Sequence, residues 1–82
     1  IAESNLNHIV SPFAHKLAEK YSLLTPAEIQ TAYLVREGKT TKDIANLLNV
    51  SPLTIESRRK EIRRKMNIQH RKMNLRSYLL SI

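Results

Sequence analysis

All three prolines of this 82-residue chain directly follow a serine or threonine, at Ser11-Pro12, Thr25-Pro26 and Ser51-Pro52. Such a pair is typical of a helix start, because the hydroxyl caps free backbone N–H groups and proline fits the first helical turn. The chain has a single glycine and almost no alternating β-branched runs, while apolar residues recur at helical spacing. We therefore expect an all-α fold of four or five short helices.

The first helix start precedes a stretch that carries its apolar residues on one face. Phe13, Leu17 and Tyr21 follow one another at intervals of four, which predicts a helix of about ten residues after Ser11. This face either packs on the same small domain or contacts a partner or an upstream domain. Because the chain begins without methionine, we expect a piece of a longer protein.

The second helix start has the pattern of a complete capping box. Thr25 and Glu28 stand three residues apart, so that each side chain can satisfy a backbone N–H group of the other. We expect the helix to end after Glu37, because Gly38 readily takes the left-handed conformation that closes a helix. Its predicted buried residues are Ile29, Ala32, Tyr33 and Leu34.

Two further helices are expected with only a short turn between them. The first opens at Thr40, has Asp43 as its capping partner and ends at Asn49, since asparagine tolerates a left-handed backbone. Ser51-Pro52 caps the second at once, and Val50 plugs the corner between them. This arrangement is a helix-turn-helix. The predicted inner face of the first helix is Ile44, Leu47 and Leu48.

The helix from Pro52 is expected to run to about Met66, where Asn67 ends it and Ile68 closes the corner. A final segment, roughly 71–80, is predicted to be the last helix. The apolar residues on one side of this segment are Leu75, Tyr78, Leu79 and Ile82.

The positive charge of the chain is concentrated near its end. Residues 1–50 carry five basic and five acidic side chains, whereas residues 51–82 carry nine basic and two acidic ones. The whole net charge of +7 therefore lies on this last part. Such a field attracts a polyanion, most simply nucleic acid, although a solvated helix face would carry the same pattern.

The basic helix has two different faces. At about 100° per residue, Ile55, Ile62 and Met66 form one stripe, which is expected to pack into the domain. Arg58 and Arg59 flank this stripe, where they either reach phosphates or pair with carboxylates inside the domain. A helix with a polar outer face fits the major groove of B-DNA. The outer face carries Leu53, Ser57, Lys60 and Arg64, with Glu56 and Glu61 on its shoulders.

Several spaced motifs carry a family resemblance. They are Leu24-Thr25-Pro26-Ala27-Glu28, residues 36–45 (REGKTTKDIA), residues 50–56 (VSPLTIE) and residues 62–66 (IRRKM). Together they are similar to the LuxR/GerE-type helix-turn-helix domain of bacterial transcription regulators, tightly over residues 24–68. The helical lead-in and the ending at residues 74–80 (NLRSYLL) resemble members in which the domain follows a PAS-type sensor.

The resemblance implies a four-helix domain with an additional N-terminal linker helix. Residues 1–23 are then a linker from a missing upstream domain, and residues 24–82 are the LuxR-type DNA-binding domain. The resemblance makes residues 52–66 the recognition helix and places dimer contact in the last helix.

From the resemblance and the helix faces together we expect three groups of site residues. The base-facing residues are Leu53, Glu56, Ser57, Lys60 and Arg64. The phosphate contacts are Thr40, Thr41, Lys42, Ser51, Thr54, Arg58, Arg59, Arg63 and Lys65. The dimer contacts are Leu75, Tyr78, Leu79 and Ile82.

The chain departs from the family pattern at three positions. Glu56, Arg58 and Asn67 stand where the family frequently has lysine, histidine and glycine. Glu56 changes what the helix can read: it either accepts a hydrogen bond from cytosine N4 or holds Arg59 or Lys60 in position. Asn67 is a mild change, because asparagine tolerates the left-handed conformation.

The function expected is sequence-specific binding of double-stranded DNA by a cytoplasmic regulator. Its expected partners are DNA, a second copy of the chain on DNA, an upstream sensor domain and RNA polymerase, with no membrane. One alternative is a promoter-reading domain like that of sigma factors. Another is a non-specific basic module that binds RNA, an acidic protein or an anionic membrane surface.

Neither an enzyme nor a cofactor or metal site is expected. The chain has no cysteine and no glycine-rich phosphate loop. His8 and His15 are seven residues apart and have no third ligand nearby. Glu56 and Glu61, five residues apart on one helix, do not face each other as a carboxylate pair.

Overall fold

The computed structural model describes residues 11–82, which form five α-helices and no strand. The helices are α2 (Pro12–Lys20), α3 (Pro26–Arg36), α4 (Thr41–Leu48), α5 (Pro52–Lys65) and α6 (Leu75–Leu80). The expected all-α fold is confirmed for this part of the chain. The stretch of the expected linker before Ser11, which includes His8, lies outside the described residues.

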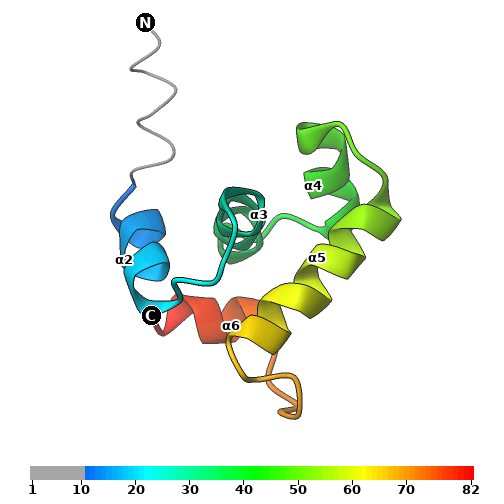
Figure 1. The fold of residues 1–82 in the computed structure, drawn as a ribbon. Coiled ribbons are helices and arrows are strands. Elements are labelled where there is room, and N and C mark those ends of the chain that lie inside the picture. The colour runs from blue at the N-terminus through cyan, green and yellow to red at the C-terminus, as the bar shows by residue number, and fades with distance from the viewer. Residues whose placement is uncertain (1–10) are drawn as a thin grey trace, which may run out of the picture.

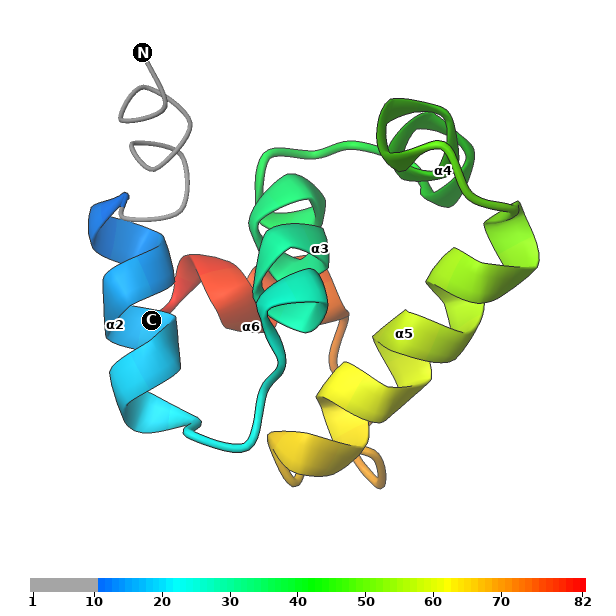
Figure 2. The same cartoon turned by 45° about the horizontal axis from the view of Figure 1, so that its top comes forward.

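Helix α3 is the centre of the domain and contacts each of the other four described helices (Figure 1). Figure 2 shows α2 and α5 on opposite sides of α3, with α6 passing behind it and α4 beside the start of α5. The core lies between these helices. Its fully buried side chains include Leu17, Ala32, Ile44, Ile55, Ile62 and Leu79.

Every described helix begins with a side-chain cap. In the capping box of α3, the Thr25 N–H donates to Glu28 Oε1 at 2.9 Å, and the Glu28 N–H donates to Thr25 Oγ1 at 3.2 Å. The Thr40–Asp43 box at the start of α4 has the same pattern. Ser11, Ser51 and Asn74 cap α2, α5 and α6. The last helix thus begins at Leu75, later than expected, because Asn74 and not an earlier residue caps it.

Helices α3, α4 and α5 end in the same way. Just beyond each helix, one residue has a positive φ. The backbone N–H of the residue after it donates to a carbonyl in the last turn of the helix. These residues are Gly38 at 92°, Asn49 at 59° and Asn67 at 61°. The returning bonds run from Lys39 N to Leu34 O (3.1 Å), Val50 N to Ala45 O (3.0 Å) and Ile68 N to Arg63 O (3.0 Å). All three predicted helix ends are therefore confirmed.

Two predicted buried faces need correction. In α3 the buried side chains are Glu28, Thr31, Ala32 and Val35, whereas Ile29, Tyr33 and Leu34 are half-buried. In α4, Leu47 is 60% exposed and Ala45 is buried in its place. The cause in both cases is rotation of the helix about its axis, which the packing of α3 against α5 and of α4 against α5 decides.

Helix α2 packs on the same core as the rest of the domain. Phe13 and Leu17 are buried, and the Tyr21 hydroxyl lies 2.5 Å from the Tyr78 hydroxyl of α6. Burial, with this hydrogen bond, raises the pKa of Tyr21 to about 12. Of the two alternatives for this face, packing on the same domain is therefore the one observed, while the origin of α2 as a linker stays a prediction.

The expected dimer contacts on α6 are corrected in part. Leu75 and Leu79 are fully buried in the core, because α6 packs against α3 through them. Tyr78 and Ile82 are half-buried and pack against the same core. Leu80, 50% exposed, is instead the apolar side chain that α6 presents to the surroundings.

Within residues 11–82, no helix combines the length and the apolar content needed to cross a membrane.

The left-handed helix ends generate a prediction for stability. Asn49→Ala and Asn67→Ala should each lower the free energy of unfolding by about 1 kcal/mol, because alanine is strained at positive φ. Asn→Gly at the same positions should cause no loss. Urea unfolding followed by far-ultraviolet circular dichroism measures this. Asn46→Ala, inside α4, is the control, and a loss as large in the control would contradict the assignment.

Candidate nucleic-acid interface

Helix α5 is anchored by one face and exposes the other. Ile55, Ile62 and Met66 are buried against the domain, so the predicted inner stripe is confirmed. Leu53 on the outer face is 73% exposed. All five residues expected to face bases are exposed: Leu53, Glu56, Ser57, Lys60 and Arg64.

Arg64 is exposed but not free. Its guanidinium forms a two-pronged ion pair with Glu61, one turn earlier, with Nε 3.1 and 3.2 Å from the two carboxylate oxygens. This hydrogen bonding lowers the pKa of Glu61 and raises that of Arg64. Arg64 would reach a base only after Glu61 releases it, so Lys60 is the more available cation of this face.

The start of α5 carries two of the expected phosphate contacts. Ser51 accepts a hydrogen bond from the Thr54 N–H at 3.2 Å, and the two hydroxyls lie 3.0 Å apart. Ser51 is exposed and Thr54 is half-buried. At the start of α4, Thr40 and Lys42 are exposed and Thr41 is half-buried. Hydroxyls and backbone N–H groups at two helix starts are suited to contacting phosphate oxygens.

Lys65, expected to contact phosphate, instead forms an ion pair inside the domain. Its amine lies 2.8 Å from Glu28 Oε1, and the two side chains are 14% and 8% exposed. Burial by itself would raise the pKa of Glu28, but the hydrogen bonds from Lys65 and Thr25 lower it below its ordinary value. The pair joins the start of α3 to the end of α5, which corrects the expectation for Lys65.

Arg63 is the second basic residue that turns inward. Its guanidinium donates to the carbonyls of Met73 at 2.9 Å, Ile68 at 3.3 Å and Arg71 at 2.8 Å. These carbonyls all belong to the segment between α5 and α6. Arg63 therefore organises that segment and is not available as a phosphate contact, which is a second correction.

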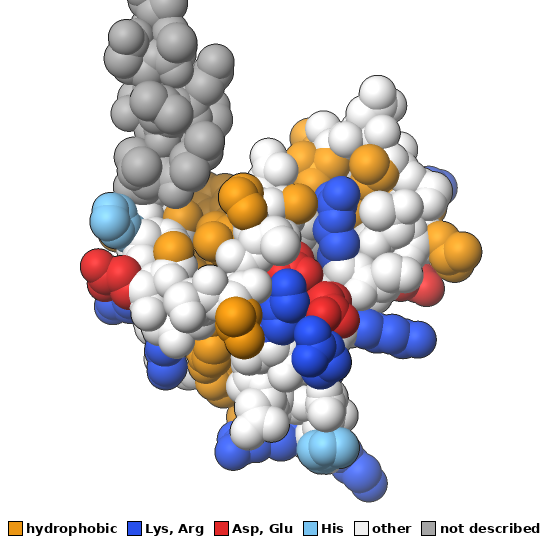
Figure 3. Space-filling view, viewed as in Figure 1, with side chains coloured by type: hydrophobic (Ala, Val, Ile, Leu, Met, Phe, Trp, Pro, Cys, Tyr) orange, Lys and Arg blue, Asp and Glu red, His pale blue; other side chains and the backbone are white. Residues whose placement is uncertain are grey.

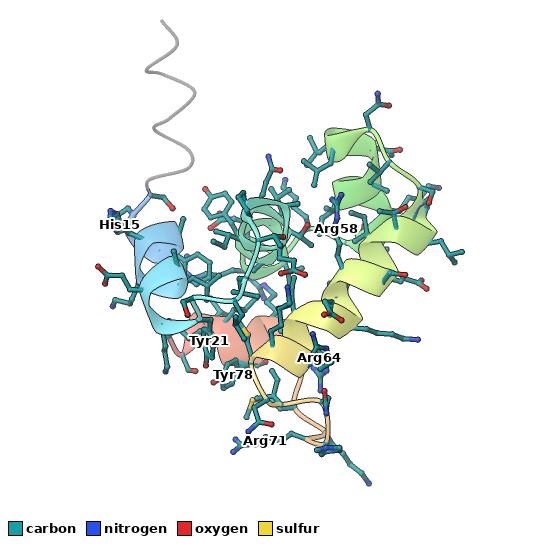
Figure 4. The ribbon with its side chains drawn as sticks, in the orientation of Figure 1. His15, Tyr21, Arg58, Arg64, Arg71 and Tyr78 are labelled. Carbon is teal, nitrogen blue, oxygen red and sulfur yellow. The ribbon has the colours of Figure 1, made fainter. Side chains whose placement is uncertain are left out.

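Arg58 and Arg59 are both half-buried beside the inner stripe of α5. Figure 4 shows Arg58 on the side of α5 that faces α4, while Arg64 lies toward the other end of the helix. Burial lowers the pKa of Arg59, nearby Arg63 lowers it further, and Glu56 opposes the shift. Within the part of the chain that the structure describes, neither arginine pairs with a carboxylate. Their contact with phosphate stays a prediction.

Three exposed basic side chains were missing from the expected site. His70, Arg71 and Lys72 are all exposed in the segment between α5 and α6. Figure 3 shows Lys and Arg side chains along α5 and on the protruding segment below it. The sequence shows these three basic residues in succession. We did not assign them to the site because a helix was expected to start near residue 71, where the structure has a loop.

A short capped helix, a tight left-handed turn and a second helix with an exposed polar face together define a helix-turn-helix domain. Among known families, the one described as "Bacterial regulatory proteins, luxR family" matches residues 22–77, which is more than half of the chain. The chain belongs to this family. It carries the helix-turn-helix domain that this family of bacterial regulatory proteins shares.

One relative is the "Uncharacterized response regulatory protein YgeK" of Escherichia coli (strain K12). The two sequences are 38% identical over 56 residues, which cover 65% of this chain and 38% of the relative. The chain thus spans little more than a third of that protein's length. No solved structure matches the chain.

The Glu28–Lys65 pair generates a prediction for the pH dependence of stability. Because folding lowers the pKa of Glu28, its contribution is complete above the ordinary glutamate pKa of 4.5 and is lost as the pH falls through the lower folded value. Glu28→Gln should remove this part of the pH dependence. At neutral pH it should lower the free energy of unfolding by about 2 kcal/mol, since Lys65 keeps a nearly buried charge without a carboxylate.

The control is Asp43→Asn, the same kind of change in the exposed capping box of α4. It should cost less than about 1 kcal/mol, because no lysine depends on Asp43. Urea unfolding at a series of pH values compares the two variants. Equal losses would show that Glu28 acts only as a cap.

Proposed function

We propose that this domain binds double-stranded DNA sequence-specifically, with α5 lying in the major groove. The observation that carries the proposal is the outer face of α5, which is exposed and polar although the inner face is fully buried. Its width and length suit the groove, and no segment among residues 11–82 covers it.

The contacts within this proposal divide between bases and backbone. Lys60 and Ser57 face bases, and Glu56 accepts from cytosine N4 or positions Arg59 or Lys60. The caps Ser51 and Thr40, with the residues that follow them, lie against phosphates on either side of the groove. Arg58 and Arg59 supply further phosphate contacts at the edge of α5.

The proposal extends to partners and location. In the full-length protein an upstream sensor domain controls this domain, which works in the cytoplasm and contacts RNA polymerase. The family membership and the small share of the relative's length that the chain spans support an additional domain. A homodimer on DNA uses the outer side of α6, where Leu80 is exposed.

Binding to DNA should depend strongly on salt and on Lys60. If about six phosphates are contacted, the logarithm of the association constant should fall against the logarithm of salt with a slope near −5. Lys60→Ala should weaken binding to a duplex selected from random sequences by roughly 10-fold or more. Fluorescence anisotropy titrations at several salt concentrations provide the measurement.

Lys16→Ala, which removes the same charge from the exposed side of α2, serves as the control and should leave the affinity nearly unchanged. If both variants lose affinity equally, the domain responds only to overall charge. Failure of the unchanged domain to bind any selected duplex would refute the proposal itself.

The homodimer generates a separate prediction. Two half-sites about 34 Å apart, one helical turn, should be filled cooperatively by two copies. Leu80→Ala should abolish the cooperativity but leave the affinity for a single half-site unchanged, because it truncates an exposed side chain. Leu23→Ala, at a 75% exposed leucine before α3, is the matched control. Retained cooperativity in Leu80→Ala would remove α6 from the interface.

A further inference from the structure

We infer that the segment between α5 and α6 is a second phosphate-binding element, which contacts the DNA backbone beyond the stretch covered by α5. We call Gln69–Lys72 the basic loop, and we assign to Arg63 the positioning of this loop. The inference rests on the proposed binding of double-stranded DNA and adds to it a further contact surface.

The backbone of the segment is held by hydrogen bonds and by one buried side chain. Asn67 turns the chain with a φ of 61°, and Ile68 is buried as an anchor. The Arg71 N–H bonds to the Ile68 carbonyl at 3.1 Å, which forms a turn around Gln69 and His70. Arg63 then donates to three carbonyls on both sides of this turn. The loop thus has a defined shape that depends on one planar guanidinium.

Fixing the backbone in this way leaves the basic side chains outside. His70, Arg71 and Lys72 are exposed, and the sequence from Asn67 to Asn74 contains no acidic residue. Within residues 11–82, neither Arg71 nor Lys72 forms an ion pair. By contrast, Lys65 and Arg64 have carboxylate partners. No carboxylate among residues 11–82 neutralises the charge of the loop, and the backbone that carries these side chains has a defined shape, which suits attraction of a polyanion.

The loop is continuous with the outer face of α5. A shallow hollow of about 340 Å³ is lined by Lys60, Glu61, Arg63 and Arg64 of α5 and by Gln69 of the loop. Figure 4 shows Arg64 and Arg71 at the same end of the molecule. A molecule bound along α5 would therefore meet the loop directly beside the charged residues of α5.

Dimensions favour the DNA backbone as the occupant. Helix α5 has 14 residues, which corresponds to about 21 Å, whereas the major groove is only about 12 Å wide. When the first turns of α5 reach the bases, as in other helix-turn-helix domains, its last turn lies toward the edge of the groove, where the phosphates run. The basic loop begins at that end, and its arginine and lysine suit phosphate oxygens.

The test uses two duplexes that contain the same selected half-site. The shorter duplex ends at the last base pair that the Arg71→Gln, Lys72→Gln domain protects from nuclease cleavage. The longer duplex continues by half a helical turn at each side. The unchanged domain should bind the longer duplex more tightly, with a salt slope steeper by about two, one for each added phosphate contact. The double variant Arg71→Gln, Lys72→Gln should bind the longer duplex no better than the shorter one.

Lys16→Gln, Lys20→Gln is the matched control, since it removes two charges from α2, on the other side of α3. It should keep the full advantage of the longer duplex. Arg63→Lys keeps the charge but has one nitrogen, which cannot replace the two guanidinium nitrogens that reach the three carbonyls. It should lose the same advantage with unchanged affinity for the shorter duplex, a pattern that a merely unstable domain would not give.

The outcomes separate this inference from the proposed function. If the unchanged domain binds neither duplex, the proposed function and the inference both fail. If it binds both duplexes equally, or if the Arg71/Lys72 variant keeps the advantage of the longer one, only the inference is overturned. The inference is also overturned if the variant loses transcriptional activity with normal DNA binding, because the loop would then contact a protein.

Discussion

The position of α5 depends on one carboxylate, that of Glu28. The same side chain closes the capping box of α3 and accepts the amine of Lys65, which ties the start of the central helix to the end of α5. Ile55 and Ile62 fix the rest of α5 by burial. Since a lysine amine so little exposed needs a carboxylate, the rotation of α5 is determined by this pair together with the apolar stripe. The exposed face of α5 is what remains.

The basic residues of this domain fall into two groups with different tasks. Arg63, Lys65 and Arg76 bond to other segments of the chain. Arg76, although exposed, donates from Nε to the Arg36 carbonyl at 3.1 Å and lies beside Gly38. Lys60, Arg71 and Lys72 are exposed and have no carboxylate partner among the described residues. A net charge of +7 therefore overstates the number of side chains available to a polyanion, while their placement on one continuous surface makes the available ones effective.

Helix α2 joins the N-terminal side of the described chain to the same core. Phe13 packs under the Arg36 guanidinium, 4.6 Å from the ring centre, and Tyr21 meets Tyr78 through their hydroxyls. These contacts reach the end of α3 and the middle of α6, so α2 is a part of the domain's core and not only a connection.

Local chemistry determined the helix boundaries of this protein before any packing was known, except for the start of α6. Caps such as Thr25 with Glu28, and left-handed ends such as Asn49 and Asn67, act within a few residues, so the sequence alone predicts them. Its periodicity also predicted the buried stripe of α5 and the exposure of its outer face. The family could be identified from the sequence for the same reason, because its motifs lie in these caps and turns.

Tertiary structure alone decided which side chains of those helices are buried, paired or exposed. Leu47 is exposed and Ala45 is buried because the packing of α4 on α5 sets the rotation of α4 about its axis. The apolar periodicity defines this rotation only to within about one residue. Lys65 and Arg63 turn inward because their partners, Glu28 and the carbonyls of the basic loop, come from other segments. The number of charged residues can be read from the sequence. Which of them form ion pairs depends on the fold, because the partners are far apart along the chain.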